Sequence, residues 1–150
     1  MSREEKKNLF ILYLLYTIQG LPIGLFASTF IIYLTEKGAS FKELGEMSII
    51  TYPFAFKIFM APILDVYFSK KIGKRKTYIV PIQYIMSISY IIMSFHIDYY
   101  IENKNVFIIT ILGFFMNFLA AIQDVAVDGW SLTMLREENL GLSFTCNMIG

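Results

Sequence analysis

Residues 105–130 read NVFIITILGFFMNFLAAIQDVAVDGW, and this stretch decides the fold. Its first 19 residues carry no charge, and a helix needs roughly 20 residues to cross the hydrocarbon core of a bilayer. The polar residues that follow, two aspartates among them, then lie toward one end of that helix. The stretch therefore predicts a transmembrane helix over about residues 106–130.

Four further apolar runs flank this stretch, and three of them are long enough to cross a bilayer. Among those three, the only charged residues inside the runs are Glu46 and Lys57. The fourth begins at about Leu140 and reaches only Gly150. The runs predict helices over about residues 9–34, 44–64 and 77–95, and an incomplete one over 141–150. The fold class is an all-α membrane protein, a multi-span helical bundle with four complete transmembrane helices and the start of a fifth.

The composition excludes a water-soluble domain. Hydrophobic residues make up 56% of the chain and charged residues 17%, whereas a soluble domain has about 25% charged residues. Cys146 and His96 are the only cysteine and histidine, which excludes a disulfide framework and a zinc site built from Cys and His alone. The sequence has no Gly-rich nucleotide loop, Ser/His/Asp spacing or extended basic arm. We therefore expect no enzyme activity, no cofactor and no nucleic-acid partner.

Basic residues concentrate in alternate segments between the predicted helices. Nine lie in the N-terminal tail and in the segments after the second and fourth helices, and three lie in the other two loops. Because basic residues mark the cytosolic side, this distribution predicts a cytosolic N-terminus. The first apolar run is longer than the 7–15-residue core of a cleaved signal peptide, so we expect a retained helix.

Lys57 lies well inside the second predicted span, about 12 Å along the helix from Asp65 at 1.5 Å per residue. A lysine at that depth costs at least ~2.5 kcal/mol, so it needs a partner or water. One interpretation is an ion pair that locks two helices together; the other, which we favour, is a cation that lines a cavity and attracts an anionic solute. Gln19 precedes Pro22 in the first span, where the segment either packs helices or stays flexible beside a substrate path that Gln19 faces.

Asp124 and Asp128 stand four residues apart, so both carboxylates project from one face of the fourth helix, about 6 Å apart along its axis. One interpretation is that both simply meet lysines at the cytosolic membrane edge. The other is that they form a gate latch or a switch sensitive to protons or cations.

The segment from Asp65 through Gly73 to Arg75 joins the second and third helices. An acidic residue, a Gly turn and a basic cluster in this order resemble the loop signature of the major facilitator superfamily. The spacer between Asp65 and Gly73 is longer here than in that signature. A basic run alone is also typical of any cytosolic loop.

Several segments together resemble one branch of that superfamily, the acetyl-coenzyme A transporters of the endoplasmic reticulum membrane. Bacterial muropeptide permeases share a shorter Gln-Asp element in the fourth helix, without the continuation Val-Asp-Gly-Trp. The segments that carry the resemblance are residues 19–25 (QGLPIGL), 53–57 (PFAFK), 61–65 (APILD), 80–85 (VPIQYI), 121–135 (AIQDVAVDGWSLTML), 138–141 (ENLG) and 145–147 (TCN).

The resemblance implies a twelve-helix fold of major-facilitator type in two six-helix halves, of which residues 1–150 form the N-terminal part of the first half. It implies a multi-pass protein of the endoplasmic reticulum membrane that moves acetyl-CoA from cytosol to lumen by alternating access, with the lipid bilayer and the remaining helices of the full-length transporter as partners. Lys57 matches a position of the family, and acetyl-CoA is an anion that needs a basic cavity. The predicted substrate-binding residues are Lys57, Gln19 and Gln123, and the predicted gating or coupling residues are Asp65, Gly73, Arg75, Asp124, Asp128 and Trp130.

Three alternatives stay open. In the first, the chain belongs to a permease for another bulky anion, such as a glycopeptide or nucleotide-linked solute. In the second, it is a truncated, non-transporting membrane protein. A membrane-embedded acyltransferase is disfavoured, because His96 lies at the non-cytosolic end of the third predicted helix without a matching partner motif.

Overall fold

The computed structural model describes residues 3–149, and these residues form helices and turns without a β-strand. Four helical rods are long and apolar enough to cross a membrane: Arg3–Glu36, Phe41–Val66, Lys76–Ser94 and Val106–Met134. The prediction of an all-α membrane bundle with four complete spans is confirmed. Gly150, the last residue of the predicted fifth helix, lies outside the described residues.

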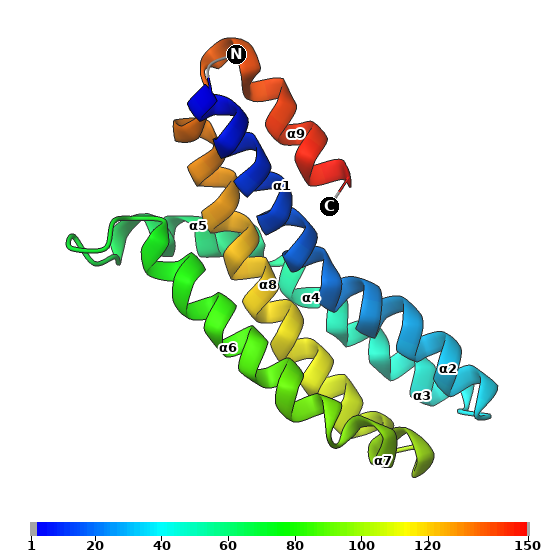
Figure 1. The fold of residues 1–150 in the computed structure, drawn as a ribbon. Helices are drawn as coiled ribbons and strands as arrows, with labels where there is room; N and C mark the ends of the chain where they lie inside the picture. The colour runs from blue at the N-terminus through cyan, green and yellow to red at the C-terminus, as the bar shows by residue number, and fades with distance from the viewer. Residues whose placement is uncertain (1–2, 150) are drawn as a thin grey trace.

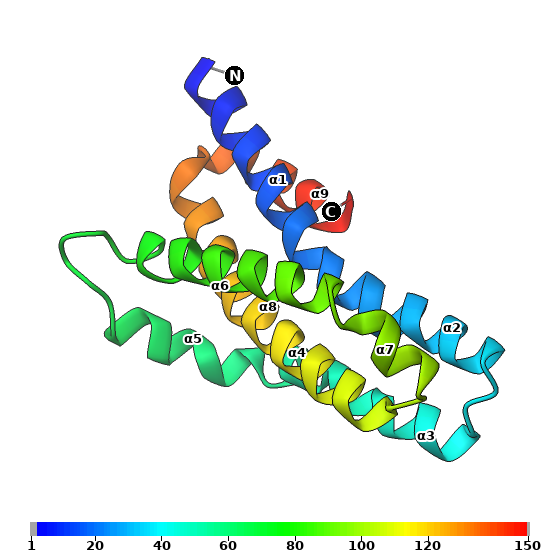
Figure 2. The ribbon, with the colours of Figure 1, turned by 60° about the horizontal axis from the view of Figure 1, so that its bottom comes forward.

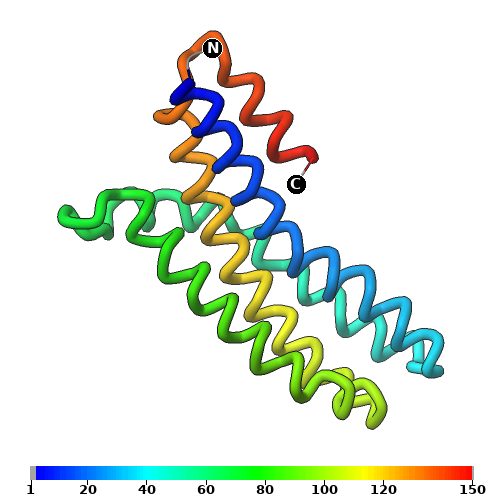
Figure 3. The backbone as a smooth tube through the Cα atoms, in the orientation of Figure 1, coloured from blue at the N-terminus to red at the C-terminus, as the bar shows by residue number. Residues whose placement is uncertain are grey.

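Two of the four rods contain irregular turns. The first consists of α1 (Arg3–Gly24), the π-helical turn η1 (Leu25–Thr29) and α2 (Phe30–Glu36). The second consists of α3 (Phe41–Glu46), the 3₁₀ turn η2 (Met47–Thr51), α4 (Tyr52–Ala55) and, after a break at Phe56, α5 (Lys57–Val66). Pro22, around which the sequence allows either helix packing or a flexible segment, lies inside α1, and the irregular turn follows it. The chain bends visibly between α4 and α5 (Figure 3).

The other two rods are regular. α6 (Lys76–Ser94) is followed by the short α7 (Ile97–Glu102), which the sequence did not predict. α8 (Val106–Met134) is the longest single helix and extends beyond its predicted end at Trp130. The turn η3 (Glu137–Asn139) then leads to α9 (Leu140–Ile149).

α8 occupies the centre of the bundle and contacts each of the other rods. In Figures 1 and 2, α1 lies along one side of α8, α6 along another, and α9 packs beside α1. The beginning of α1, the end of α5, the beginning of α6 and the end of α8 lie at one end of the bundle, which we call the basic end because it carries the loop with Lys70–Lys76.

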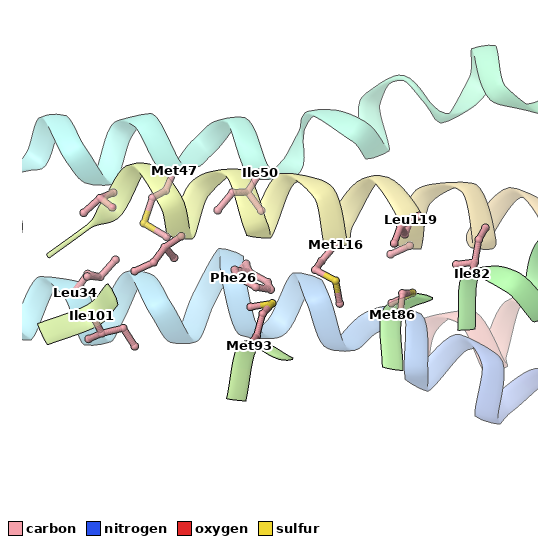
Figure 4. Close-up of a cluster of buried hydrophobic side chains, with 13 residues drawn as sticks. Phe26, Leu34, Met47, Ile50, Ile82, Met86, Met93, Ile101, Met116 and Leu119 are labelled. Atoms are coloured by element: carbon pink, nitrogen blue, oxygen red, sulfur yellow. The ribbon is translucent and has the colours of Figure 1, made fainter. Parts of the chain in front are cut away.

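A large cluster of buried hydrophobic side chains forms the core of the bundle in the half away from the basic end (Figure 4). Within it, Phe26 of η1 and Ile50 of η2 are fully buried and pack against α8 at Gly113. A Cβ added to Gly113 would lie 2.8 Å from Phe26 Cδ1 and 2.9 Å from Ile50 Cδ1. The two irregular turns therefore meet α8 at a position that only glycine fits.

Replacing Gly113 by alanine is expected to destabilise the bundle. The added methyl group overpacks the core, which costs about 1–3 kcal/mol, so the melting temperature of the protein in detergent should fall. Gly24→Ala is the matched control, because a Cβ on that helical residue meets no atom within 4 Å. An unchanged or higher melting temperature for Gly113→Ala would contradict this packing.

Candidate functional site

Lys57 and Asp124 form an ion pair between α5 and α8. Lys57 Nζ lies 2.7 Å from Asp124 Oδ2, and Gln19 Nε2 of α1 donates a 2.6 Å hydrogen bond to Asp124 Oδ1. The Asp124 side chain is only 6% exposed, whereas that of Lys57 is 43% exposed. Asp124 is therefore satisfied on both oxygens, while Lys57 keeps an open side.

Asp128 bonds to a different set of partners. The hydroxyl of Tyr16 on α1 donates a 2.8 Å hydrogen bond to Asp128 Oδ1, and Asn147 Nδ2 on α9 donates to the same oxygen at 3.4 Å. The Tyr16 hydroxyl also lies 3.5 Å from Ser143 Oγ. This network joins α1, α8 and α9.

Tyr16, Ser143 and Asn147 are not among the site residues predicted from the sequence. A signal for them is present, because Ser143 and Asn147 stand four residues apart and therefore share one face of their helix. Tyr16 stands three residues before Gln19, on the same face of α1.

Gln123 is fully buried between three helices. Its Oε1 accepts a 3.0 Å hydrogen bond from Gln83 Nε2 of α6, and its Nε2 donates to the carbonyl oxygen of Leu15 at 3.4 Å. Gln123 thus joins α1, α6 and α8, and it is not among the residues that line the cavity described below.

A second ion-pair cluster closes the loop between α5 and α6. Asp65 Oδ1 lies 3.1 Å from Lys74 Nζ and 3.0 Å from Arg75 Nη1. Gly73 has a φ of +99°, a left-handed conformation that favours glycine, and its backbone N–H donates to the Ser69 carbonyl at 2.9 Å. The turn at Gly73 thus brings the basic residues back to the end of α5.

The guanidinium of Arg75 lies directly on Gly129 of α8. A Cβ added to Gly129 would collide with the guanidinium carbon and would lie 2.8 Å from Nη1. Glycine at this position therefore allows the loop to contact the central helix.

A cavity of about 630 Å³ lies between α1, α5, α8 and α9, toward the basic end. Lys57 and Arg75 are the cations that line it, and Asp65 and Asp128 are the carboxylates. Tyr16, Ser143 and Asn147 add uncharged polar groups, and most of the remaining wall is apolar. The cavity therefore offers both cations and hydrogen-bonding groups to a solute.

The structure brings together most of the residues that the sequence singled out. Lys57 is both ion-paired and open to the cavity, so the two interpretations of this residue are compatible. Asp124 and Gln19 lie behind Lys57, and Trp130 packs against the hydrophobic cluster around Tyr16 and Val127. The roles assigned to these residues stay predictions.

The predicted gating or coupling residues that carry a charge fall into three separate networks. Asp65 pairs with Arg75, Asp124 pairs with Lys57, and Asp128 bonds to Tyr16. Within residues 3–149, no group of three His, Cys, Asp or Glu side chains is placed to hold a metal ion.

A protein-family model described as "Acetyl-coenzyme A transporter 1" matches residues 8–150. Over the full chain, the sequence is 36% identical to an uncharacterized protein of Schizosaccharomyces pombe and 34% identical to an uncharacterized membrane protein of Saccharomyces cerevisiae. Over 93% of the chain it is 24% identical to the anhydromuropeptide permease of Escherichia coli K12. The chain spans 28–30% of the length of these three relatives. No solved structure matches it.

Proposed function

The chain belongs to the acetyl-coenzyme A transporter family, and from this premise we propose that it forms the N-terminal part of a secondary transporter that moves acetyl-CoA from the cytosol into the lumen of the endoplasmic reticulum. The observation that carries the proposal is Lys57, a cation inside a membrane span that keeps an open side toward a cavity.

The chemistry of the cavity agrees with this cargo. Acetyl-CoA carries several phosphate charges, and a lysine in a low-dielectric site attracts an anion more strongly than it does in water. Asp124 keeps its hydrogen bond from Gln19 when an anion engages Lys57, so binding does not leave that carboxylate without a donor. A solute phosphate can therefore replace Asp124 as the partner of Lys57.

The charge distribution supports access to the cavity from the cytosol. The cavity lies toward the basic end, where nine basic residues mark the cytosolic side by the positive-inside rule. In alternating access, this arrangement corresponds to a state open to the cytosol. The Asp65–Arg75 pair and the turn at Gly73 then act as parts of the gate, with the remaining helices of the full-length transporter completing the path.

A second candidate is a permease for another bulky anion. The identity to the anhydromuropeptide permease favours it, and the uncharged groups of Tyr16, Ser143 and Asn147 suit the amides and hydroxyls of a glycopeptide as well as those of coenzyme A.

Uptake into proteoliposomes by the full-length protein separates these candidates. We expect labelled acetyl-CoA to accumulate intact, because transport leaves the thioester unbroken. Unlabelled CoA should inhibit the uptake of labelled acetyl-CoA at least 10-fold more strongly than an equal concentration of an anhydromuropeptide or a nucleotide sugar. Uptake of the muropeptide without uptake of acetyl-CoA would favour the second candidate, and recovery of free CoA with a transferred acetyl group would revive the acyltransferase.

A further inference from the structure

We infer that Arg75 is a second anion ligand of the cavity and that the solute carries two separate phosphate groups, one for Lys57 and one for Arg75. This inference rests on the proposed transport of an anionic solute. It adds a specificity-determining role to a residue that otherwise acts only in a gate.

Arg75 is placed to bind a solute. Its guanidinium lines the same cavity as Lys57, and its side chain is 19% exposed. It lies on Gly129, where no side chain stands between the guanidinium and α8. A guanidinium has five N–H donors in a planar fork that suits bidentate binding of phosphate, and the ion pair with Asp65 is made through Nη1.

Asp65 can release Arg75 at low cost. Lys74 Nζ lies 3.1 Å from the same carboxylate oxygen that Arg75 contacts, and the Asp65 side chain is 48% exposed. Lys74 and water therefore continue to stabilise Asp65 when the guanidinium turns to a phosphate. A buried carboxylate without a second partner could not release its cation in this way.

The two cations lie at different depths. Lys57 begins α5 and Asp65, the partner of Arg75, stands eight residues later, which is about 12 Å along the helix at 1.5 Å per residue. Asp128 adds a further carboxylate to the cavity lining, and this carboxylate repels phosphate. The arrangement suits two phosphate groups held apart within one molecule. In coenzyme A these are the diphosphate, which we assign to Lys57, and the ribose 3′-phosphate, which we assign to Arg75.

The test compares CoA with 3′-dephospho-CoA, which lacks one of the two phosphate groups. With the full-length protein in detergent, wild type should bind CoA about 10-fold or more tightly than dephospho-CoA. Arg75→Ala should weaken CoA binding by about 10-fold to 100-fold and change dephospho-CoA binding less than twofold, so the preference disappears. Arg75→Lys keeps the charge without the fork and should retain part of the preference; it replaces Arg75→Ala if that variant does not fold.

Lys71→Ala is the matched control, because it also removes a cation from the loop between α5 and α6 but changes an exposed residue outside the cavity lining. It should keep the wild-type preference for CoA. Equal weakening of both probes by Arg75→Ala, or loss of the preference in Lys71→Ala, would overturn the inference while leaving the proposed transport intact. Failure of wild type to bind either probe would overturn both.

Discussion

Replacement of Lys57 by alanine is expected to lower acetyl-CoA uptake by the full-length transporter at least 100-fold. The substitution removes the deeper of the two cations that line the cavity. It also leaves Asp124, whose side chain is 6% exposed, with Gln19 as its remaining donor among the described residues. Because Lys57 is partly exposed, the cost lies below the value of about 3–5 kcal/mol for a fully buried pair, but uptake and stability should both fall. The measurement is the initial rate of labelled acetyl-CoA uptake into proteoliposomes, normalised to folded protein.

A double variant separates the two consequences. Lys57→Met with Asp124→Asn removes both charges, and the amide oxygen of asparagine can still accept the hydrogen bond from Gln19. We expect this pair to recover the melting temperature of the wild type and to remain inactive, because no cation returns to the cavity. Lys57→Arg keeps the charge and should retain measurable uptake. Full uptake by the uncharged pair would show that Lys57 is a structural residue and not a ligand.

The sequence predicts the number and placement of the spans because hydrophobic length is a local property. It also places Lys57, Asp124 and Asp128 inside membrane helices, where their cost requires partners. The sequence does not identify those partners, since Lys57 and Asp124 stand 67 residues apart. The hydrophobic pattern of each helix does not indicate which helices pack against each other. The two aspartates do share a face of α8, but α5 and α1 supply the partners of Asp124, whereas α1 and α9 supply those of Asp128.

The irregular turns are a second feature that local patterns do not predict. η1 and η2 carry no sequence signal of their own beyond nearby Pro22 and Pro53. They lie where Phe26 and Ile50 meet Gly113, so their conformation depends on packing between residues distant in sequence. The contact between Arg75 and Gly129 was not predicted either, because it joins residues distant in sequence. A glycine in a helix does not by itself indicate which side chain packs against it.

Replacement of Gly129 by alanine is expected to reduce uptake about 10-fold without loss of stability. The new methyl group would occupy the space of the Arg75 guanidinium. Because that guanidinium is the end of a flexible side chain, it moves away and the backbone does not. Both its contact with Asp65 and its proposed contact with phosphate are then weakened. Alanine is more favourable than glycine in a helix interior by about 1 kcal/mol, so the melting temperature should stay equal or rise.

Opposite changes in stability and uptake distinguish displacement of Arg75 from general misfolding. Gly141→Ala in α9 is the control, because a Cβ there meets no atom within 4 Å, and it should leave uptake unchanged. In an Arg75→Ala background, Gly129→Ala should cause no further loss, since the group that it displaces is already absent. If Gly129→Ala lowers uptake equally in both backgrounds, it acts through α8 itself. If it leaves wild-type uptake unchanged, the position of Arg75 on Gly129 is not required for transport, and neither the gate nor the phosphate contact depends on it.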